Sequence, residues 1–254
     1  MIFSVLASGS KGNISYIASC STKILIDAGI SASLIEKNLM DLSVNPNEVD
    51  GILLTHTHVD HINGLKTFIK KYNTKVYLSE KMYNEIEKQI NLINFEIIDK
   101  FITINDIDIE IIKTSHDTDD SNGYILTSND KSIAYITDTG YINRKNHSKL
   151  INKTAYIMES NHDVEMLMNG NRPYHIKQRI LGDRGHLSNK LSSEYISNFI
   201  GNNTKKIVLI HLSEDNNKPE IALNTLKDTL VSKNIKFDDI IISSQKERTE
   251  LVSL

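Results

Sequence analysis

The sequence predicts a mixed α/β fold that forms one domain over residues 1–254. Segments with the apolar runs of strands alternate with segments of helical spacing, and no low-complexity linker interrupts them. The chain also divides into two comparable halves, each rich in strands first and in helices later. A chain of this length can bury a large core, and α/β folds of similar size commonly remain a single domain.

In the first half, short apolar runs bounded by turns predict strands, and apolar residues three and four positions apart predict helices. The predicted strands are residues 2–7, 14–19, 22–27, 50–55 and 75–79. The predicted helices are residues 61–72, residues 80–90 and a segment around Leu34, Ile35 and Leu39 that Ser31 or Ser33 can cap.

In the second half, two hairpins and three buried strands are separated by helical segments. The hairpins pair 101–104 with 107–114 around Asn105-Asp106, and 123–128 with 132–137 around Asn129-Asp130. The remaining predicted strands are 154–159, 205–211 and 239–243. The remaining predicted helices lie near 143–150, 174–181, 188–200 and 218–232.

The cysteine content and the net charge indicate in which cellular compartment the protein works and what kind of partner it can bind. The one cysteine, Cys20, excludes an intramolecular disulfide and suits a reducing cytoplasm, and we expect its thiol to pack in the strand region 14–20. We expect neither a signal peptide nor a membrane span, because no apolar run approaches the ~18 residues that a span needs. The formal net charge is −3, so any surface that binds DNA must be a local one.

Residues 55–61 read Thr-His-Thr-His-Val-Asp-His, between a strand pattern and a helical pattern. His56 and His58 can point the same way, because alternate residues of an extended segment share a face. The following turn directs Asp60 and His61 toward a neighbouring position. Imidazole and carboxylate donors without a thiolate suit zinc, manganese or iron. The alternative is a chance cluster of surface histidines, which the recurrence of candidate ligands downstream disfavours.

Four further polar residues directly follow apolar, β-branched runs, so that each would emerge at the same rim of a sheet. They are Asp27, His116, Asp138 and His211. With residues 55–61 they resemble, in type and in order, the HxHxDH motif and the later ligands of the metallo-β-lactamase superfamily. The resemblance covers nearly the whole chain, and it implies a four-layer αββα sandwich.

The resemblance also implies a centre of two divalent ions, zinc or manganese, with iron also suitable. The implied ligands of one ion are His56, His58 and His116. The implied ligands of the other are Asp60, His61 and His211. Asp138 would bridge the ions, between which a hydroxide would form and attack the scissile bond. Asp27 would orient a ligating imidazole through its second ring nitrogen, and its alternative role is a turn or helix cap.

Residues 155–163, 182–189 and 7–13 resemble a narrower group, the YycJ/WalJ-type family. This resemblance implies a 5′-to-3′ exonuclease that acts on double-stranded DNA in mismatch repair, with repair proteins as candidate partners. In the first of these segments, Glu159 and His162 have no assigned chemical step, and we expect them to brace the site through hydrogen bonds.

The segment 182–189 holds two candidates for contact with substrate. His186 could bind a phosphate oxygen or protonate the leaving 3′-oxygen, and it is therefore a candidate catalytic residue beside Asp60 and Asp138. Its alternative role is a surface histidine after a glycine turn. The guanidinium of Arg184 suits a pair of phosphate oxygens.

A basic segment is the candidate track for DNA. Between residues 170 and 190 five cations face one acid, Asp183, in a chain that is slightly acidic. The five cations are Arg172, Lys177, Arg179, Arg184 and Lys190. For the helical ones, the alternative is an ordinary solvated helix face. Ser10 and Asn13 lie in a loop whose amides could approach an anion, although a plain turn is an equal alternative.

Two other classes of function compete with a nuclease. A small-molecule metallohydrolase, such as a cyclic phosphodiesterase, thioesterase or lactonase, would use the same metal centre but needs no basic track. A non-catalytic DNA-binding module would retain the fold alone, yet all seven ligands of the motif are present. The residue pattern does not separate zinc from manganese or iron, DNA from RNA, or one oligomeric state from another.

Overall fold

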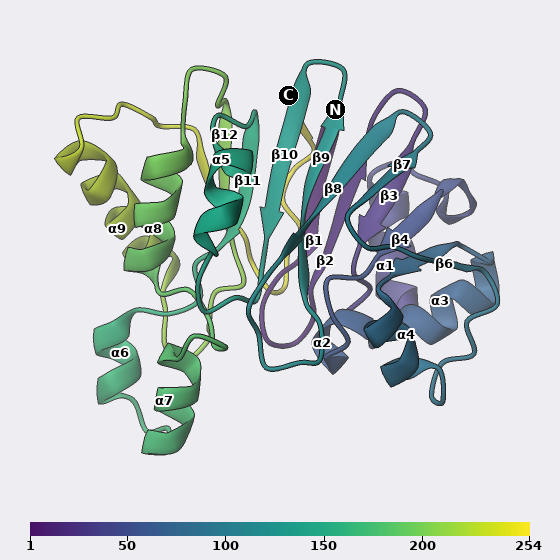
Figure 1. Ribbon diagram of the computed structural model, residues 1–254, viewed down its shortest axis with the longest axis horizontal. Helices are drawn as coiled ribbons and strands as arrows, with labels where there is room; N and C mark the ends of the chain where they lie inside the picture. The colour runs from purple at the N-terminus through teal and green to yellow at the C-terminus, as the bar shows by residue number, and fades with distance from the viewer.

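Two seven-stranded sheets face each other at the centre of the computed structural model, which describes residues 1–254 (Figure 1). In spatial order the first sheet consists of β14 (Val252–Ser253), β1 (Ile2–Ala7), β2 (Ile14–Ala18), β3 (Lys23–Ile26), β4 (Gly51–Leu53), β5 (Val76–Leu78) and β6 (Phe95–Ile97). Neighbouring strands are antiparallel from β14 to β3 and parallel from β3 to β6.

The second sheet repeats this plan. Its spatial order is β13 (Ile240–Ile242), β12 (Lys206–Ile210), β11 (Ala155–Glu159), β10 (Lys131–Ile136), β9 (Asn122–Ser128), β8 (Ile107–Lys113) and β7 (Phe101–Ile104). The hairpin strands β7 to β10 are antiparallel, and β10 to β13 are parallel. Each sheet therefore joins an antiparallel half to a parallel half.

Helices cover the outer face of each sheet and complete four layers, as the family resemblance implies. The first sheet is covered by α1 (Ala32–Asp41), α3 (Leu65–Tyr72) and α4 (Glu80–Ile86). The second is covered by α5 (His147–Leu150), α8 (Asn189–Phe199) and α9 (Pro219–Ser232). The other helical segments are η1 (Pro46–Glu48), α2 (Val59–Ile62), η2 (Arg144–Asn146), α6 (Val164–Asn169) and α7 (Tyr174–Leu181).

Alternate residues of the central strands serve different cores. In β3, Ile24 and Ile26 belong to the core between the sheets, whereas Leu25 packs in the core under the helices. In β12, Val208 faces the other sheet and Leu209 faces the helices. Because both faces of these strands are buried, their sequences read as continuous apolar runs.

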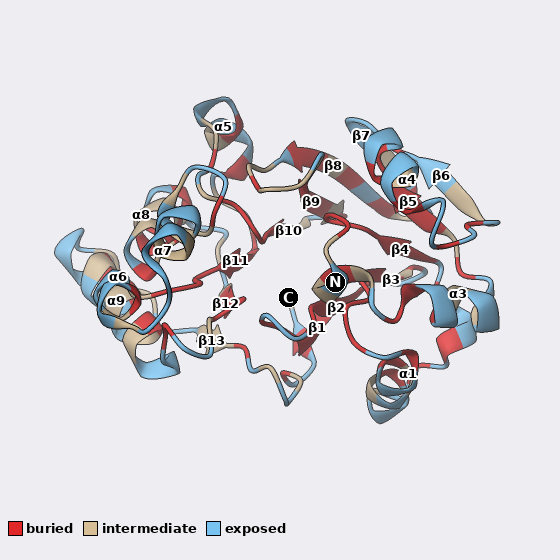
Figure 2. Ribbon diagram, turned by 90° about the horizontal axis from the view of Figure 1, so that it is seen from below, coloured by how far each residue is buried: buried red, intermediate tan, exposed pale blue.

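The carboxyl ends of β3, β4, β8, β10, β11 and β12 lie along one edge of the sandwich. In Figure 1 this is the lower edge, beyond which α2, α6 and α7 also lie. Figure 2 looks onto that edge: buried strands lie in the middle, and exposed helical segments lie around them. Polar residues that follow these strands are thereby brought to one place, as the sequence predicts.

The predicted helix over residues 61–72 is wrong in one respect, because two helices, α2 and α3, meet near Gly64. The amide of Gly64 donates a hydrogen bond to the carbonyl of Ala28 at 2.8 Å. A Cβ atom at this position would lie 2.0 Å from the carbonyl oxygen of Ile30. Only glycine permits so close a backbone approach, and the continuous helix is interrupted there.

Two strands and one side-chain environment also differ from expectation. The sequence does not predict β6 or β14, which are short strands at the two edges of the first sheet. Cys20 was expected to be packed, which is wrong: it lies in the bend between β2 and β3 with its side chain exposed. None of the helices has both the length and the apolar character needed to cross a bilayer.

Candidate metal centre

The histidine-rich loop after β4 is held in place by Asp27, a buried residue directly after β3. The carboxylate of Asp27 accepts hydrogen bonds from the amide and the hydroxyl of Thr55, each at 2.7 Å. It also accepts one from Nδ1 of His61 at 2.7 Å. His61 is thus held with Nε2 toward the other donors, which is the arrangement expected for a carboxylate that orients a metal ligand.

Four overlapping groups of donor atoms converge beside this loop, and within each group the donors lie within 4.8 Å of one another. Two of these groups both contain Asp138, and one of the two also includes Glu159 and His186. The remaining two groups share no residue. One group consists of His56, His58 and His116. The other consists of Asp60, His61 and His211. In the first group Nε2 of His56 lies 3.1 Å from Nδ1 of His58. In the second, Oδ2 of Asp60 lies 3.6 Å from Nε2 of His61 and 3.9 Å from Nε2 of His211.

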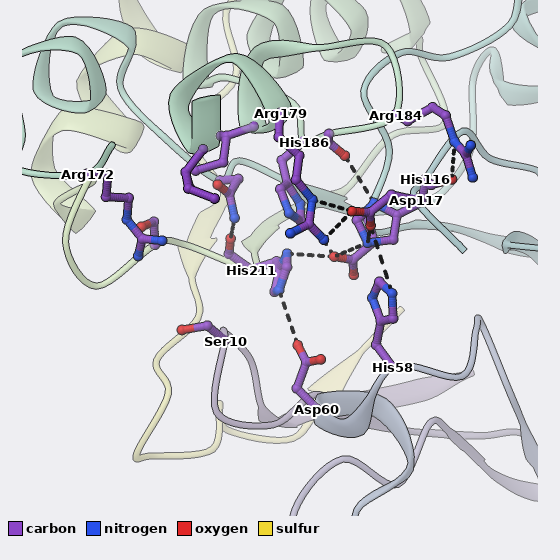
Figure 3. Close-up of a pocket in the computed structure, with 16 residues that line it drawn as sticks. Ser10, His58, Asp60, His116, Asp117, Arg172, Arg179, Arg184, His186 and His211 are labelled. Atoms are coloured by element: carbon purple, nitrogen blue, oxygen red, sulfur yellow. Dashed lines mark hydrogen bonds and ion pairs between the residues drawn. The ribbon is translucent and has the colours of Figure 1, made fainter. Parts of the chain in front are cut away.

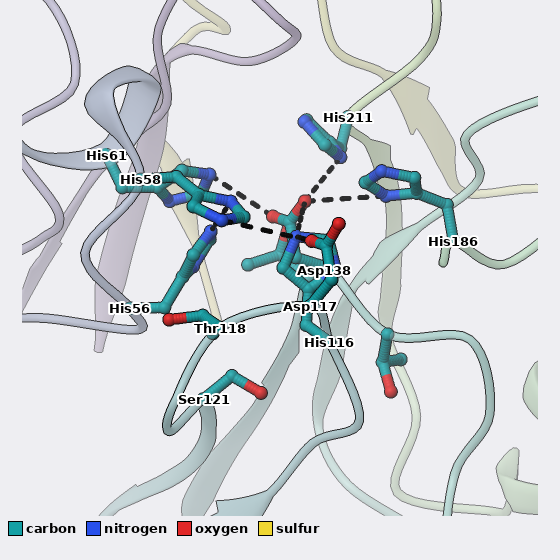
Figure 4. A network of polar contacts seen from close by, with 12 residues as sticks. His56, His58, His61, His116, Asp117, Thr118, Ser121, Asp138, His186 and His211 are labelled. Atoms are coloured by element: carbon teal, nitrogen blue, oxygen red, sulfur yellow. Dashed lines mark hydrogen bonds and ion pairs between the residues drawn. The ribbon is translucent and has the colours of Figure 1, made fainter. Parts of the chain in front are cut away.

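Asp138 lies between the two groups. Its Oδ2 is 3.2 Å from Nε2 of His61, and its Oδ1 is 3.9 Å from Nε2 of His116 (Figure 4). Oδ1 also lies 3.2 Å from Nδ1 of His211. The carboxylate therefore approaches donors of both groups. This donor set, imidazole and carboxylate with no thiolate, fits divalent metal ions of the kind found in hydrolytic centres.

Three residues of the centre adopt left-handed backbone conformations. Asp27, Asp138 and His211 have φ angles of 62°, 45° and 58°. Such conformations cost about 1–3 kcal/mol each for residues other than glycine, and they persist where the surroundings impose them. All three positions come one or two residues after a buried strand, where the chain must turn to present a side chain along the sheet edge.

Glu159, the last residue of β11, braces the opposite side of the centre from a buried position. Its Oε2 accepts hydrogen bonds from the amides of Thr139 and Leu187, at 3.1 and 3.0 Å. Its Oε1 accepts from Nδ1 of His186 at 2.7 Å and from Nδ1 of His211 at 2.9 Å. The sequence singled out this residue without a chemical step, and the structure gives it four hydrogen bonds.

His162 behaves differently from Glu159. Its ring is buried, and neither ring nitrogen has a hydrogen-bond partner. Burial lowers its pKa to about 4, so the ring is neutral near neutral pH. The expected bracing hydrogen bonds of its side chain are therefore not formed, and only its backbone carbonyl takes part, accepting from the amide of Asn189 at 2.8 Å.

The donor histidines of the metal-free centre differ in pKa: burial lowers the pKa of His56 and His116, whereas nearby acids raise that of two others. Burial would lower the pKa of His61, but Asp27 and Asp138 outweigh burial and raise it to about 10. Burial acts on His211 in the same way, and Asp138 with its neighbouring acids holds the pKa of His211 well above its ordinary value. Both rings therefore hold a proton that a metal ion would have to displace.

We expect metal binding to release protons and to strengthen as the pH rises. Below pH 10 His61 is protonated in the metal-free protein, whereas a metal ion binds the neutral ring. At pH 7 about one or more protons should leave per molecule that binds metal. Calorimetric titrations in buffers of different ionisation enthalpy measure this number. A heat that does not depend on the buffer would contradict the protonated state of these rings.

A cavity of about 270 Å³ opens above the donors (Figure 3). Its lining includes the candidate substrate contacts Ser10, Arg172, Arg179, Arg184 and His186. The guanidinium of Arg172 pairs with Asp215 at 2.8 Å, and that of Arg179 pairs with Asp117. Arg184 instead donates to the backbone carbonyls of His116 and Thr118, each at 3.0 Å.

Two other candidate contacts lie elsewhere. Lys177 does not line the cavity, and its ammonium donates to the carbonyl of Met168 at 2.6 Å. Asn13 is buried behind the ligands, where its amide lies 3.2 Å from Oδ2 of Asp60 and 3.0 Å from Nε2 of His61. Asn13 is therefore placed to support the ligands and is not exposed to a substrate.

Asp117 is a residue of the site that the sequence interpretation does not name. It lines the cavity directly after His116, at the start of a bend over residues 117–119. The sequence does not show which acid of this segment faces the centre, because three occur within four positions: Asp117, Asp119 and Asp120. The bend in the folded chain selects Asp117, because it places the Asp117 side chain in the same cavity as His116.

Comparisons with known proteins agree with this geometry. Residues 22–212 match the family described as beta-lactamase superfamily domain. The chain is 41% identical over 238 residues to the exodeoxyribonuclease YycJ of Bacillus anthracis, covering 91% of this chain and 89% of that protein. It is 39% identical over 240 residues to the exodeoxyribonuclease WalJ of Streptococcus pneumoniae serotype 2, covering 92% and 89%.

A solved structure shows the same fold at lower identity. The metallo-beta-lactamase fold protein YhfI from Bacillus subtilis superposes with a TM-score of 0.74, at 15% identity and with 98% of each chain covered. Three observations lead to one conclusion: the four-layer sandwich, the order of the candidate ligands along the chain, and the similarity to YycJ and WalJ over about nine tenths of each chain. The chain belongs to the beta-lactamase superfamily and, within it, to the group that contains YycJ and WalJ.

Proposed function

We propose that this protein is a metal-dependent exodeoxyribonuclease that cleaves the phosphodiester bonds of double-stranded DNA from a 5′ end. The observation that carries the proposal is the cavity, where two groups of metal donors lie under a rim that bears arginines. Metal donors and arginines together suit a phosphodiester, whose oxygens are negatively charged. The full-length relatives named exodeoxyribonucleases support DNA as the substrate.

The seven donors named by the sequence fit two ions. His56, His58 and His116 would hold one ion, and Asp60, His61 and His211 the other. Asp138 would lie between them and contact both. Bound there, two divalent ions such as Zn²⁺ or Mn²⁺ would activate water near neutral pH and stabilise negative charge on the phosphodiester oxygens. Asp27, Asn13 and Glu159 keep the side chains in place through the hydrogen bonds described above.

His186 is placed to handle a proton at the leaving group. Its ring lines the cavity, and its Nδ1 donates to the carboxylate of Glu159, which leaves Nε2 free. Burial would lower the pKa of His186, but Glu159 outweighs burial and raises it. A ring that carries a proton on Nε2 can donate it to the departing 3′-oxygen, which is the role of a general acid.

Replacement of His186 by Ala should slow cleavage by about 10²–10⁴-fold, the usual contribution of a general acid. Metal content should remain close to that of the wild type, because the seven donors are untouched. Single-turnover cleavage and metal analysis of the same sample measure both quantities. Loss of metal in this variant would show that His186 is a ligand or a structural residue.

Two of the three arginines that line the cavity, Arg172 and Arg179, should contribute to DNA affinity, and Lys177 should not. Each phosphate contact that is lost reduces the slope of log affinity against log salt by about 0.9. The double variant Arg172→Gln, Arg179→Gln should therefore weaken binding and reduce the slope by about 2. Lys177→Gln is the matched control, because its ammonium lies outside the cavity. Fluorescence anisotropy without divalent metal measures binding alone, and equal slopes for all proteins would contradict the role of the two arginines.

The cavity argues against a small-molecule hydrolase with an acyl substrate. Only two of its 16 lining residues are hydrophobic, Ile176 and Ile180. Sites for small organic ligands are lined mainly by apolar and aromatic side chains, with a few polar groups that fix the ligand. A polar cavity bordered by arginines suits a phosphodiester better than a thioester or a lactone.

We also propose a biological setting for this activity. A 5′-to-3′ exonuclease on duplex DNA would remove strands during mismatch repair, in the cytoplasm and with other repair proteins as partners. The names of YycJ and WalJ support the exonuclease part of this setting.

The test is digestion of linear double-stranded DNA that carries a label at its 5′ or its 3′ end. Manganese and zinc are supplied in parallel, and the Asp60→Ala variant reports contaminating nucleases. Release of 5′-terminal nucleotides by the wild type alone would support the proposal. An absence of cleavage by protein shown to hold two ions would overturn it in favour of a small-molecule esterase or phosphodiesterase.

A further inference from the structure

The histidines of the donor groups each have a second ring nitrogen, and in four of the five it is fixed by a hydrogen bond. Nδ1 of His61 donates to Asp27, Nδ1 of His116 to the carbonyl of Gly185, Nδ1 of His211 to Glu159, and Nδ1 of His56 to the hydroxyl of Thr55. Such bonds select the tautomer and the ring orientation that a metal ion requires.

His58 is the exception. Its Nδ1 lies 3.1 Å from Nε2 of His56 and therefore faces the donor group. Its Nε2 makes no hydrogen bond, and the nearest acidic oxygen is Oδ1 of Asp117 at 3.8 Å (Figure 4). The His58 side chain is also the most exposed of the five, at 34%. A ligand at the cavity mouth thus lacks the anchor that the buried ligands have.

Asp117 offers the matching acceptor. Its Oδ1 is buried and has no hydrogen-bond partner, although an unpaired buried polar atom costs about 1–3 kcal/mol. Oδ1 also lies 3.3 Å from Nε2 of His116, but that nitrogen faces the donor group, since Nδ1 donates to Gly185. A bound ion would occupy Nε2 of His116 and leave His58 as the partner for Oδ1.

The other oxygen of Asp117 is already fixed. Oδ2 pairs with the guanidinium of Arg179 on α7, as the close-up of the cavity shows (Figure 3). Nε2 of His58 and Oδ1 of Asp117 therefore lie near each other, and neither has a hydrogen-bond partner. The carboxylate of Asp117 is held in place by Arg179.

We propose that Asp117 is a positioning residue for His58: it accepts the Nε2 proton of His58 and thereby directs Nδ1 to the metal ion. The inference rests on the dinuclear centre proposed above and adds one residue to it. Through Arg179 it also links a metal ligand to helix α7, which borders the cavity where DNA would lie.

Calorimetric titration of Mn²⁺ into the metal-free protein tests this role without any measurement of cleavage. Asp117→Ala should weaken one of the two sites by about 10–100-fold, the effect typical of losing an outer partner of a ligand. Asp117→Asn should restore most of the affinity, because an amide oxygen still accepts the Nε2 proton. Asp119→Ala is the matched control, an exposed acid two positions away that should bind like the wild type.

Each other outcome overturns a defined part of the inference. Wild-type affinity in Asp117→Ala would show that Asp117 does not orient His58. Loss of the site in both Asp117 variants, to the extent seen in His58→Ala, would make Asp117 a direct ligand and reject the positioning role. A wild-type protein that binds no ion would instead refute the proposed metal centre itself, and with it the proposed function.

Discussion

Replacement of Asp138 by Ala is expected to abolish cleavage. Asp138 lies near donors of both groups, so its loss would affect both of the proposed ions at once. The rate should fall by about 10³-fold or more, because removal of an outer partner of a ligand alone costs about 10–100-fold. Metal content should fall in parallel, as metal analysis of the dialysed protein measures.

The backbone at this position calls for a second variant. Asp138 has a φ of 45°, a conformation that asparagine tolerates and that costs alanine about 1–2 kcal/mol. Asp138→Asn keeps the volume and the turn but removes the charge, so it should remain folded and yet be inactive. Asp119→Ala is the control for an exposed acid in the same sheet region and should be fully active. Activity of Asp138→Asn near wild type in a metal-reconstituted sample would refute the bridging position.

The residues that the structure brings together as candidate metal donors could be named from the sequence because each is marked by its local surroundings. A polar residue that follows a buried strand within one or two positions lies at the sheet edge, and Asp138 and His211 are such residues. The HxHxDH loop adds its own spacing, so that four donors are identified by seven consecutive residues. The same logic predicted most strands, because a strand buried on both faces reads as an apolar run.

Among the residues that hold the donors in place, Asp27 and Glu159 were expected from the sequence, whereas Asn13 and Asp117 could not be assigned this role. Asn13 and Asp60 are 47 positions apart, and their contact depends on how β2 and α2 pack. Asp117 is one acid among several in its segment, and the bend at residues 117–119 selects it. The basic segment illustrates the same limit, since Arg179 lines the cavity while Lys177, two positions away on the same short helix, does not. Side-chain direction on α7, and not its composition, decides which cation can meet a phosphate.

Among the residues that support the donors, Glu159 has the largest expected effect on stability. It is fully buried and accepts four hydrogen bonds, two of them from backbone amides. Glu159→Ala would leave these amides without partners and a protonated His211 without its nearest counter-charge. Breaking a buried charged pair in this way costs about 3–5 kcal/mol. For a chain of this size, that corresponds to a melting temperature lower by on the order of 10 °C.

The pH dependence separates this carboxylate from a neutral hydrogen-bond acceptor. Burial would raise the pKa of Glu159, but His186 and His211 outweigh burial and lower it from 4.5 to about 2. A carboxyl group whose pKa is lower in the folded state stabilises the protein above pH 4.5, and this contribution is lost as the pH falls toward 2.

The Glu159→Gln variant keeps the volume and an acceptor oxygen, so it should be more stable than Glu159→Ala. Because glutamine does not titrate, the stability of this variant should not change with pH through residue 159. Thermal unfolding of the metal-free proteins between pH 6 and pH 2 measures the difference. If Glu159 is the buried anion that holds His186 and His211, the curves of wild type and Glu159→Gln should converge below about pH 4.5; parallel curves would mean that a neutral acceptor serves as well.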